Sequence, residues 1–198
     1  MNSLLVTYIL QTEKWTSPEL FETKNRIYTF LNPVSYLIAL ENKSLFEQFD
    51  GIFADGSLLV SAIRLVYGKR VTRRSFDMTS LAPELLNYLM ESRKTLYIVA
   101  SGQEQVECSV RIFQEQYPEL RIAGFRNGYF SSDAEMNKEA SHIVELNPDF
   151  LIVGMGALMQ EKFLLKVKKM GYQGIGFTCG GFVHQTAMNR MHYYPNWV

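Results

Sequence analysis

From residue 95 onwards, short apolar runs alternate with segments whose apolar residues recur at helical spacing. Thr95–Ala100 predicts a buried strand, and the spacing of apolar residues over 106–117 predicts the helix that follows. Asp149–Gly154 is continuously apolar after its first residue, as expected for a parallel strand covered on both faces. Further strands are predicted at 121–125 and 174–178, and further helices at 132–146 and 159–169. This alternation predicts an α/β, Rossmann-like layered fold with a mostly parallel sheet and helices on both faces.

The first half of the chain repeats the scheme less regularly. Met1–Leu10 is apolar and lacks the features of a signal peptide, so we expect a first strand there. Strands are also predicted at 26–31 and 52–54, and helices at 33–39, 56–67 and from Thr79 or Ser80 to Glu91. The 56–67 helix is expected to bury an apolar side formed by Leu58, Leu59, Ala62, Ile63 and Val66. With no linker-like stretch, we expect a single domain over 1–198, with any subdivision near 92–95.

Charge and cysteine usage narrow the function classes. The 198 residues carry 20 basic and 20 acidic side chains, so the basic excess typical of a nucleic-acid-binding protein is missing. A small anionic ligand needs only a few local donors and stays compatible with this balance. Cys108 and Cys179 are far apart and show no metal-ligand spacing, which favours reduced thiols in a cytoplasmic protein. Neither a metal site nor a membrane-spanning helix is predicted.

Three predicted strand ends carry residues suited to ligand binding. Asn32 follows the 26–31 strand, Asp55 follows the 52–54 strand, and Gly154 and Gly156 follow the 149–154 strand. In open α/β sheets, ligands bind beyond the carboxyl ends of the strands. The two glycines allow the backbone to approach a ligand, and the N-terminus of the helix after them favours an anion such as phosphate. Tyr129 and Phe130 are aromatic candidates for lining a sugar or uracil pocket, although Phe130 is at least as compatible with the core.

Each candidate also has an ordinary structural interpretation. Asp55 and Asn32 are residue types that cap helices or form turns, and the glycine pair lacks the third glycine of a dinucleotide fingerprint. Gln160 and Glu161 stand in a first helical turn, where acidic residues are common because of the helix dipole. Cys179 with His184 suggests a thiol nucleophile, but no third orienting group is evident, and His184 and His192 fall in a glycine-rich tail expected to be irregular.

Taken together, the motifs resemble the WecG/TagA/CpsF family of glycosyltransferases from about Tyr28 to the end of the chain. The most specific pieces are the Gly-Tyr-Phe segment at 128–130 and the G-x-G-x-x-x-Q-E-K segment at 154–162. The other matching pieces are Asn32-Pro33, Ala54-Asp55-Gly56, Pro148-Asp149, and the tail from Gly180-Gly181-Phe182 to Pro195-Asn196-Trp197.

The resemblance implies an inverting transfer of N-acetylmannosamine, its uronate or a hexose from a UDP-sugar to a polyprenyl-diphosphate-linked saccharide. This chemistry belongs to cell-surface polysaccharide or teichoic-acid synthesis, in the cytoplasm or peripherally at the inner face of the bacterial plasma membrane. It implies Asp55 as the catalytic base, with Asn32, Gly102, Gln160 and Glu161 at the substrates. The resemblance implies no cofactor, no metal and no nucleic-acid partner. It does not fix the oligomeric state, and a homo-oligomer stays open.

This chain departs from the family pattern in three places. Leu158-Met159 stands where members usually have Pro-Lys, the R-V-T-G-x-D segment is altered over 70–77, and the R-A-P segment is altered over 190–195. Two other hypotheses therefore stay open at this point. The protein is a nucleotide-sugar-binding module that does not complete the reaction, or it is a nicotinamide-dependent oxidoreductase. Members also continue beyond the equivalent of Trp197-Val198 with a basic, apolar segment implicated in membrane attachment and active-site closure. We expect this chain to be either a truncated form or a naturally short member whose full activity needs that segment.

Overall fold

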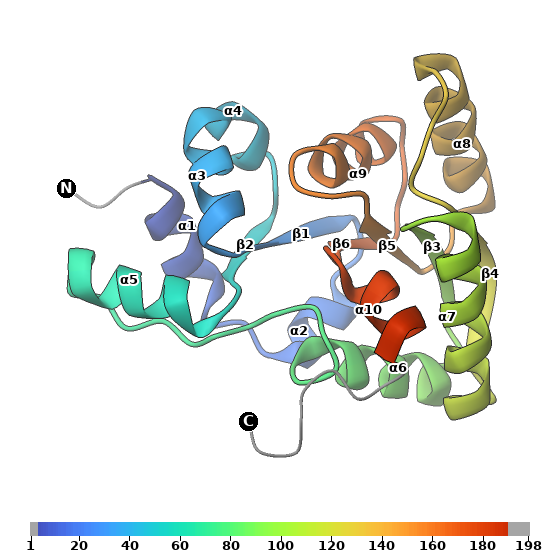
Figure 1. Ribbon diagram of the computed structural model, residues 1–198, viewed down its shortest axis with the longest axis horizontal. Coiled ribbons are helices and arrows are strands. Elements are labelled where there is room, and N and C mark those ends of the chain that lie inside the picture. The colour runs from blue at the N-terminus through green and yellow to red at the C-terminus, as the bar shows by residue number, and fades with distance from the viewer. Residues whose placement is uncertain (1–3, 190–198) are drawn as a thin grey trace.

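The computed structural model describes residues 4–189, which contain one sheet of six parallel strands (Figure 1). In sheet order the strands are β2 (Gly51–Ala54), β1 (Arg26–Leu31), β6 (Ile175–Thr178), β5 (Phe150–Gly154), β3 (Thr95–Ala100) and β4 (Arg121–Arg126). Every neighbouring pair is parallel. The predicted α/β fold is confirmed, and strands from both sides of residues 92–95 belong to the same sheet.

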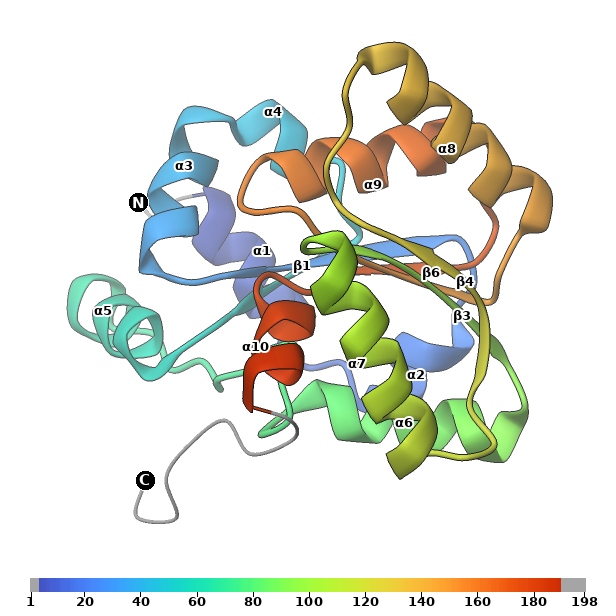
Figure 2. The same cartoon turned by 45° about the vertical axis from the view of Figure 1, so that its right-hand side comes forward.

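Helices cover both faces of this sheet, as predicted (Figure 2). One buried cluster joins the sheet to α2 (Ser17–Glu22), α6 (Leu81–Ser92), α7 (Gln103–Gln116) and α10 (Phe182–Asn189). The cluster on the opposite face joins it to α1 (Leu4–Thr12), α3 (Pro33–Glu41), α4 (Lys43–Phe46), α5 (Ser57–Tyr67), α8 (Asp133–Leu146) and α9 (Met159–Lys169).

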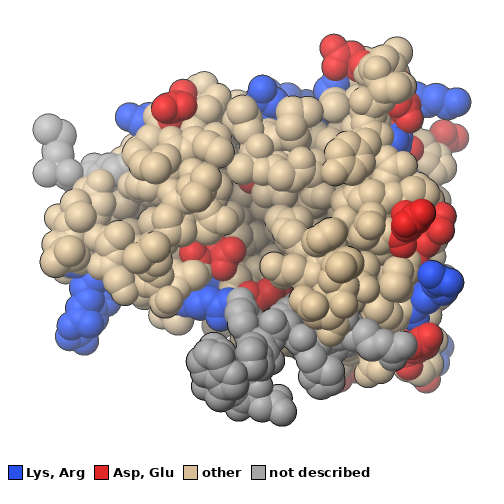
Figure 3. Space-filling view, viewed as in Figure 1, with Lys and Arg blue, Asp and Glu red and all other residues tan. Residues whose placement is uncertain are grey.

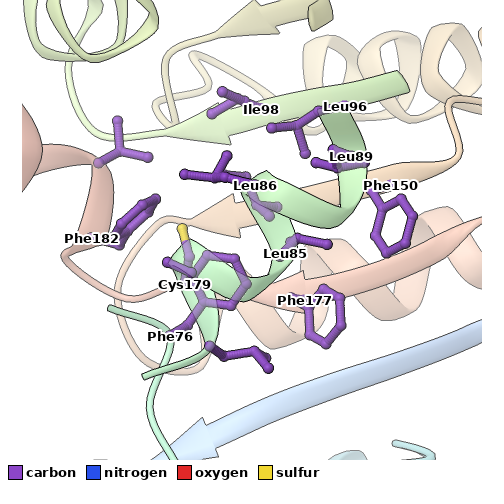
Figure 4. Close-up of a cluster of buried hydrophobic side chains, with 14 of the residues drawn as sticks. Phe76, Leu85, Leu86, Leu89, Leu96, Ile98, Phe150, Phe177, Cys179 and Phe182 are labelled. Atoms are coloured by element: carbon purple, nitrogen blue, oxygen red, sulfur yellow. The ribbon is translucent and has the colours of Figure 1, made fainter. Parts of the chain in front are cut away.

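Aromatic packing fixes the loop between α5 and α6 to the sheet (Figure 4). Phe76, in that loop, lies with its ring centroid 5.6 Å from that of Phe177 on β6 and 5.3 Å from that of Phe182 on α10. All three side chains are buried. Burying a phenylalanine side chain contributes about 1.5–3 kcal/mol, so this cluster holds three separate chain segments together at one end of the sheet.

Two predicted elements were wrong. The segment predicted as a first strand is α1, which buries Leu5, Val6, Ile9 and Thr12. That spacing is helical, but periodicity separates strand from helix poorly in a short run rich in β-branched residues. The tail predicted to be irregular around His184 is α10; His192 lies outside the described residues. The short helices α2 and α4 were not predicted.

Helix α5 occupies the predicted position, but its expected apolar side is only partly buried. Leu59 and Ile63 pack into the core, whereas Leu58 and Val66 are each 69 % exposed and Ala62 is also exposed. Leu65, which was not assigned to that side, is 87 % exposed. A helix that buries one wide apolar face and a helix that buries only part of it have the same sequence pattern. The pattern alone therefore cannot show which apolar residues meet solvent.

The helices that follow neighbouring central strands leave on opposite faces. Strands β1 and β5 lead into α3 and α9 on one face, and β3 and β6 lead into α7 and α10 on the other. Such divergence opens a crevice at the carboxyl ends of the strands, where ligands of open α/β sheets bind. Backbone hydrogen bonds continue past the strand ends, from Ser101 N to Gly154 O and from Cys179 N to Val153 O. These bonds give the floor of the crevice a fixed shape.

Candidate active site

Two adjoining cavities lie at the carboxyl ends of the strands. The first, called the Tyr129 cavity, has a volume of about 490 Å³ and is lined by Ser101, Gly128, Tyr129, Phe130, Met136, Gly154, Met155, Gly156, Met159, Gly180 and His184. The second, called the Asp55 cavity, has a volume of about 410 Å³ and is lined by Phe30, Asn32, Ser35, Asp55, Phe76, Asp77, Gly156, Ala157, Gln160, Thr178, Cys179, Gly180, Gly181, Phe182 and Gln185. Gly156 and Gly180 line both, so a single extended ligand can occupy the two together.

Asp55 is held by the sheet and lines the second cavity. The Asp55 amide donates to Leu31 O at 2.8 Å, which extends the pairing of β1 with β2 by one residue. The N-cap of α5 is Gly56, and no side-chain hydrogen bond caps that helix, so Asp55 is not a cap. Burial raises the pKa of Asp55, and the neighbouring Asp77 carboxylate raises it further, whereas Arg73 opposes the shift. A carboxylate with a raised pKa, open to a cavity, is suited to accept a proton.

Asp77 was not among the residues predicted from the sequence, although it lines the same cavity. Its Oδ2 accepts from Arg73 at 2.6 Å, and its Oδ1 accepts from the amide and hydroxyl of Thr79 at 2.8 and 2.6 Å. Asp77 therefore organises its own loop while adding negative charge beside Asp55. The sequence did carry a signal, because Asp77 ends the altered R-V-T-G-x-D segment at 70–77 and stands three residues after Arg74.

Asn32 and Gln160 line the Asp55 cavity from two different helix starts. Asn32 caps α3, because its Oδ1 accepts from the amides of Val34 and Ser35 at 3.0 Å each. Gln160 is 4 % exposed, and its Oε1 accepts from the Gly180 amide at 3.2 Å. Asn32 is therefore a helix cap that also lines the cavity. Gln160 connects the start of α9 to the loop before α10.

Glu161 is fully buried and lines neither cavity. Its Oε1 accepts from Thr29 Oγ1 and Gln160 Nε2, each at 2.9 Å, and its Oε2 accepts from the Leu158 amide at 2.7 Å. Burial raises the pKa of Glu161, and these hydrogen bonds oppose the shift. The network continues through Thr29, which accepts from the hydroxyl of Thr178 at 2.9 Å. As a substrate contact Glu161 stays a prediction; the geometry gives it a supporting position behind Gln160 and Thr178.

Gly154 lies where two loops approach too closely for a side chain. A Cβ built at this residue would lie 2.6 Å from Gly180 O and 2.8 Å from Cys179 Sγ. Gly180 belongs to both cavity walls, so the absence of a side chain at Gly154 allows the two strand-end loops to meet. Gly102 does not line either cavity; it is the N-cap of α7, directly after Ser101, which does.

We expect Gly154→Ala to lower the free energy of unfolding by about 1–3 kcal/mol, the usual cost of forcing an extra group into a packed site. The backbone oxygen of Gly180 cannot yield as a flexible side chain would. Gly181→Ala is the control, because a Cβ there meets only Gln185 side-chain atoms at 3.7 and 3.9 Å. Urea unfolding measures both, and equal stability of the two variants would contradict the close approach.

The Tyr129 cavity has an aromatic and thioether wall. Tyr129 is 75 % exposed, and its amide donates to Asn127 Oδ1 at 2.9 Å, which fixes the backbone of the turn. Phe130 packs against Phe163, with ring centroids 5.3 Å apart, while also lining the cavity. The cavity thus offers an exposed aromatic face at its rim and an apolar floor, a surface on which a flat heterocycle packs well.

No lysine or arginine lines either cavity within residues 4–189. Helix N-termini lie near the junction instead, because α9 begins three residues after Gly156 and α10 begins two residues after Gly180. A helix N-terminus carries about half a positive elementary charge and exposes N–H donors, so the junction of the cavities favours an anion. Over the same residues no group of three His, Cys, Asp or Glu is placed to hold a metal.

Cys179 does not behave as a nucleophile in this setting. Its side chain is 4 % exposed, and burial raises the pKa of its thiol to about 12. A neutral thiol is a poor nucleophile at physiological pH. The alternative of a Cys179–His184 thiol site is therefore not supported. Both cysteines are free.

Comparison with known proteins gives consistent matches over most of the chain. The model of the family described as "Glycosyl transferase WecG/TagA/CpsF family" matches residues 10–198. A protein of Shigella boydii named UDP-Gal:alpha-D-GlcNAc-diphosphoundecaprenol beta-1,4-galactosyltransferase is 33% identical over 172 residues, which cover 87% of this chain and 71% of the relative. A Bacillus subtilis (strain 168) protein named N-acetylglucosaminyldiphosphoundecaprenol N-acetyl-beta-D-mannosaminyltransferase is 23% identical over 185 residues, covering 91% of this chain and 69% of the relative.

Proposed function

Because the chain belongs to the WecG/TagA/CpsF family of glycosyltransferases, we propose that it transfers a sugar from a UDP-sugar to a saccharide linked to a polyprenyl diphosphate. The observation that carries this proposal is the pair of joined cavities, one with a carboxylate of raised pKa and the other with an aromatic rim. The family assignment leaves the nicotinamide-dependent alternative without support.

The nucleotide fits the Tyr129 cavity best in this proposal. Uracil would pack against the aromatic and methionine wall, and the diphosphate would lie over Gly156 and Gly180 at the start of α9 and α10. There the helix dipoles stabilise the negative charge that develops on the leaving UDP. This chain has Leu158-Met159 where the family pattern has Pro-Lys, so it lacks a basic side chain at this place. In the proposal the helix dipoles stabilise the leaving UDP in its stead.

The sugar and the acceptor hydroxyl then meet in the Asp55 cavity. Asp55 would take the proton of that hydroxyl as it attacks the anomeric carbon, and the bond to UDP would break on the opposite side. This single displacement inverts the anomeric centre. The names of both relatives specify a β-linked product, and UDP-galactose is an α-linked donor, so inversion is the outcome we propose. No metal or other cofactor enters the mechanism proposed.

UDP-galactose and UDP-N-acetylmannosamine are the donors to test first, because the names of the two relatives specify galactosyl and N-acetylmannosaminyl transfer. The acceptor is N-acetylglucosaminyl diphosphate on a short, water-soluble polyprenyl chain. Formation of a β-linked disaccharide with either donor supports the proposal, and an α-linked product would overturn inversion. Calorimetric UDP binding without transfer to any acceptor would instead favour the nucleotide-sugar-binding module.

A further inference from the structure

We propose that α5, with the first turns of α3, forms a docking surface for an anionic lipid bilayer. Seven large apolar side chains within residues 4–189 are more than 60 % exposed, and five of them lie on these two helices. These five, called the α3–α5 surface, are Val34 (68 %), Leu37 (63 %), Leu58 (69 %), Leu65 (87 %) and Val66 (69 %). The two helices follow the neighbouring strands β1 and β2 and pack on the same face of the sheet, and exposed apolar groups concentrated in such a region mark a binding surface.

On α5 the exposed residues form a stripe along the helix. Leu58, Ala62, Leu65 and Val66 are separated by four, three and one residues, which places them within one arc of a helix of 3.6 residues per turn. Leu59 and Ile63 occupy the neighbouring arc and face the core. The helix therefore has two apolar arcs, and the outer arc faces no helix or strand in the described part of the chain. An amphipathic helix of this kind can lie in a membrane interface.

The basic side chains around this stripe favour an anionic partner. Residues 56–76 contain five basic and no acidic side chains, in a chain whose total charge is zero. Arg73 and Arg74 are engaged by Asp77 and by the Trp15 carbonyl, whereas Arg64, Lys69 and Arg70 are exposed. In Figure 3 the left-hand end of the molecule, over α5, is almost free of charge, and basic side chains lie along its lower edge. Apolar side chains flanked by basic ones match the acyl boundary and headgroups of an anionic leaflet.

The position of the surface suits a lipid-borne substrate, and in this respect the inference rests on the proposed function. Helix α3 begins directly after Asn32, and α5 begins two residues after Asp55. Both residues line the Asp55 cavity. A bilayer against Val34 and Leu58 would therefore lie beside the entrance through which a polyprenyl-linked saccharide reaches Asp55. No helix within residues 4–189 is long and apolar enough to cross the membrane.

The test is cosedimentation of the full chain with vesicles of phosphatidylcholine alone or of equal parts phosphatidylcholine and phosphatidylglycerol. We expect binding to the anionic vesicles and its weakening by salt. Leu65→Gln with Val66→Gln places a good helix former at both positions and should weaken binding at least about tenfold. Lys69→Glu with Arg70→Glu should weaken it by more than about fivefold per residue, because each change removes an attraction and adds a repulsion.

The matched control is Leu146→Gln, an exposed leucine at the end of α8, and the figures show α8 on the opposite side of the molecule from α5 (Figures 1 and 2). Failure of the unaltered chain to bind anionic vesicles would overturn the inference, as would equal binding by the Leu65/Val66 variant. Loss of a solution dimer in that variant, with vesicle binding kept, would show the surface to be a contact between copies and would also overturn it.

Transfer to the water-soluble acceptor separates this inference from the proposed function. The Leu65/Val66 variant should retain that transfer, because neither side chain lines a cavity. Vesicle binding without any transfer would count against the function and keep the surface. Transfer without vesicle binding would support the proposed function and overturn the docking surface.

Discussion

Asp55→Asn should lower the rate of sugar transfer by about 10²–10⁴-fold, the usual contribution of a general base. An asparagine amide keeps the size of the side chain but cannot accept the proton of the acceptor hydroxyl. UDP binding should be nearly unchanged, because the proposed nucleotide site is the Tyr129 cavity, which Asp55 does not line. Transfer kinetics and calorimetry measure the two quantities. Asp133→Asn, an exposed aspartate at the start of α8, is the matched control.

The same substitution should not destabilise the fold at neutral pH. The pKa of Asp55 is raised in the folded state, so the folded state holds the proton more tightly than the unfolded state does. Stability therefore falls as pH rises through the window from the ordinary aspartate pKa to the raised one, and above that window the full penalty remains. Asparagine removes this penalty, so the variant should melt at or above the temperature of the unaltered protein. An inactive variant that melts much earlier would point to a structural role instead.

The pH profile offers an independent check on the base. Transfer should decline on acidification as Asp55 takes up a proton, and the midpoint should lie above the usual range of an aspartate. Asp77→Asn removes the neighbouring negative charge and should move this midpoint to lower pH. A midpoint that does not move would remove Asp77 as an electrostatic partner of Asp55.

Glu161→Ala should lower the free energy of unfolding by about 2–6 kcal/mol, because it leaves two buried donors without a partner and each costs about 1–3 kcal/mol. The donors affected are the Leu158 amide and the Gln160 side chain; the Thr29 hydroxyl can rotate to another acceptor. Leu158 has φ = +73°, a backbone conformation that costs a non-glycine residue about 1–2 kcal/mol. The carboxylate of Glu161 holds it there.

The loss should extend to the site, because Gln160 would no longer be fixed against the Gly180 amide. Urea unfolding gives the stability and calorimetry gives UDP binding. Glu115→Ala, an exposed glutamate of α7, should change the unfolding free energy by less than about 0.5 kcal/mol. A Glu161→Ala protein as stable as the Glu115→Ala protein would rule out the supporting role of the buried carboxylate.

Much of the fold was predictable because the parallel strands are nearly all apolar and the helices end at recognisable residues. The helix predicted at 132–146 is an example: at its start the Ser132 Oγ accepts from the Glu135 amide at 3.2 Å. The N-terminal segment was not predictable in the same way, since a short apolar run fits a strand and a helix equally well. Only packing of α1 against β2 decides between them, and packing is a long-range property.

The site was predictable only where strand ends carried a distinctive residue. Asp55, Asn32 and Gln160 line the Asp55 cavity, and Tyr129, Gly154 and Gly156 line the Tyr129 cavity. Asp77 and Thr178 were missed, because one stands in an irregular loop and the other reads as an ordinary strand residue. Their approach to the cavity depends on how distant segments pack, which no local pattern records.

The two cavities meet only at Gly156 and Gly180, residues without side chains. Substitutions that remodel the wall around Tyr129 and Met136 therefore need not disturb the wall around Asn32 and Gln185, and the reverse also holds. In the proposed arrangement, selection that keeps the nucleotide and selection for a new sugar or acceptor act on separate sets of codons. A scaffold divided in this way suits the diversification of surface polysaccharides, because the transferred sugar or its acceptor can change while the nucleotide carrier stays the same.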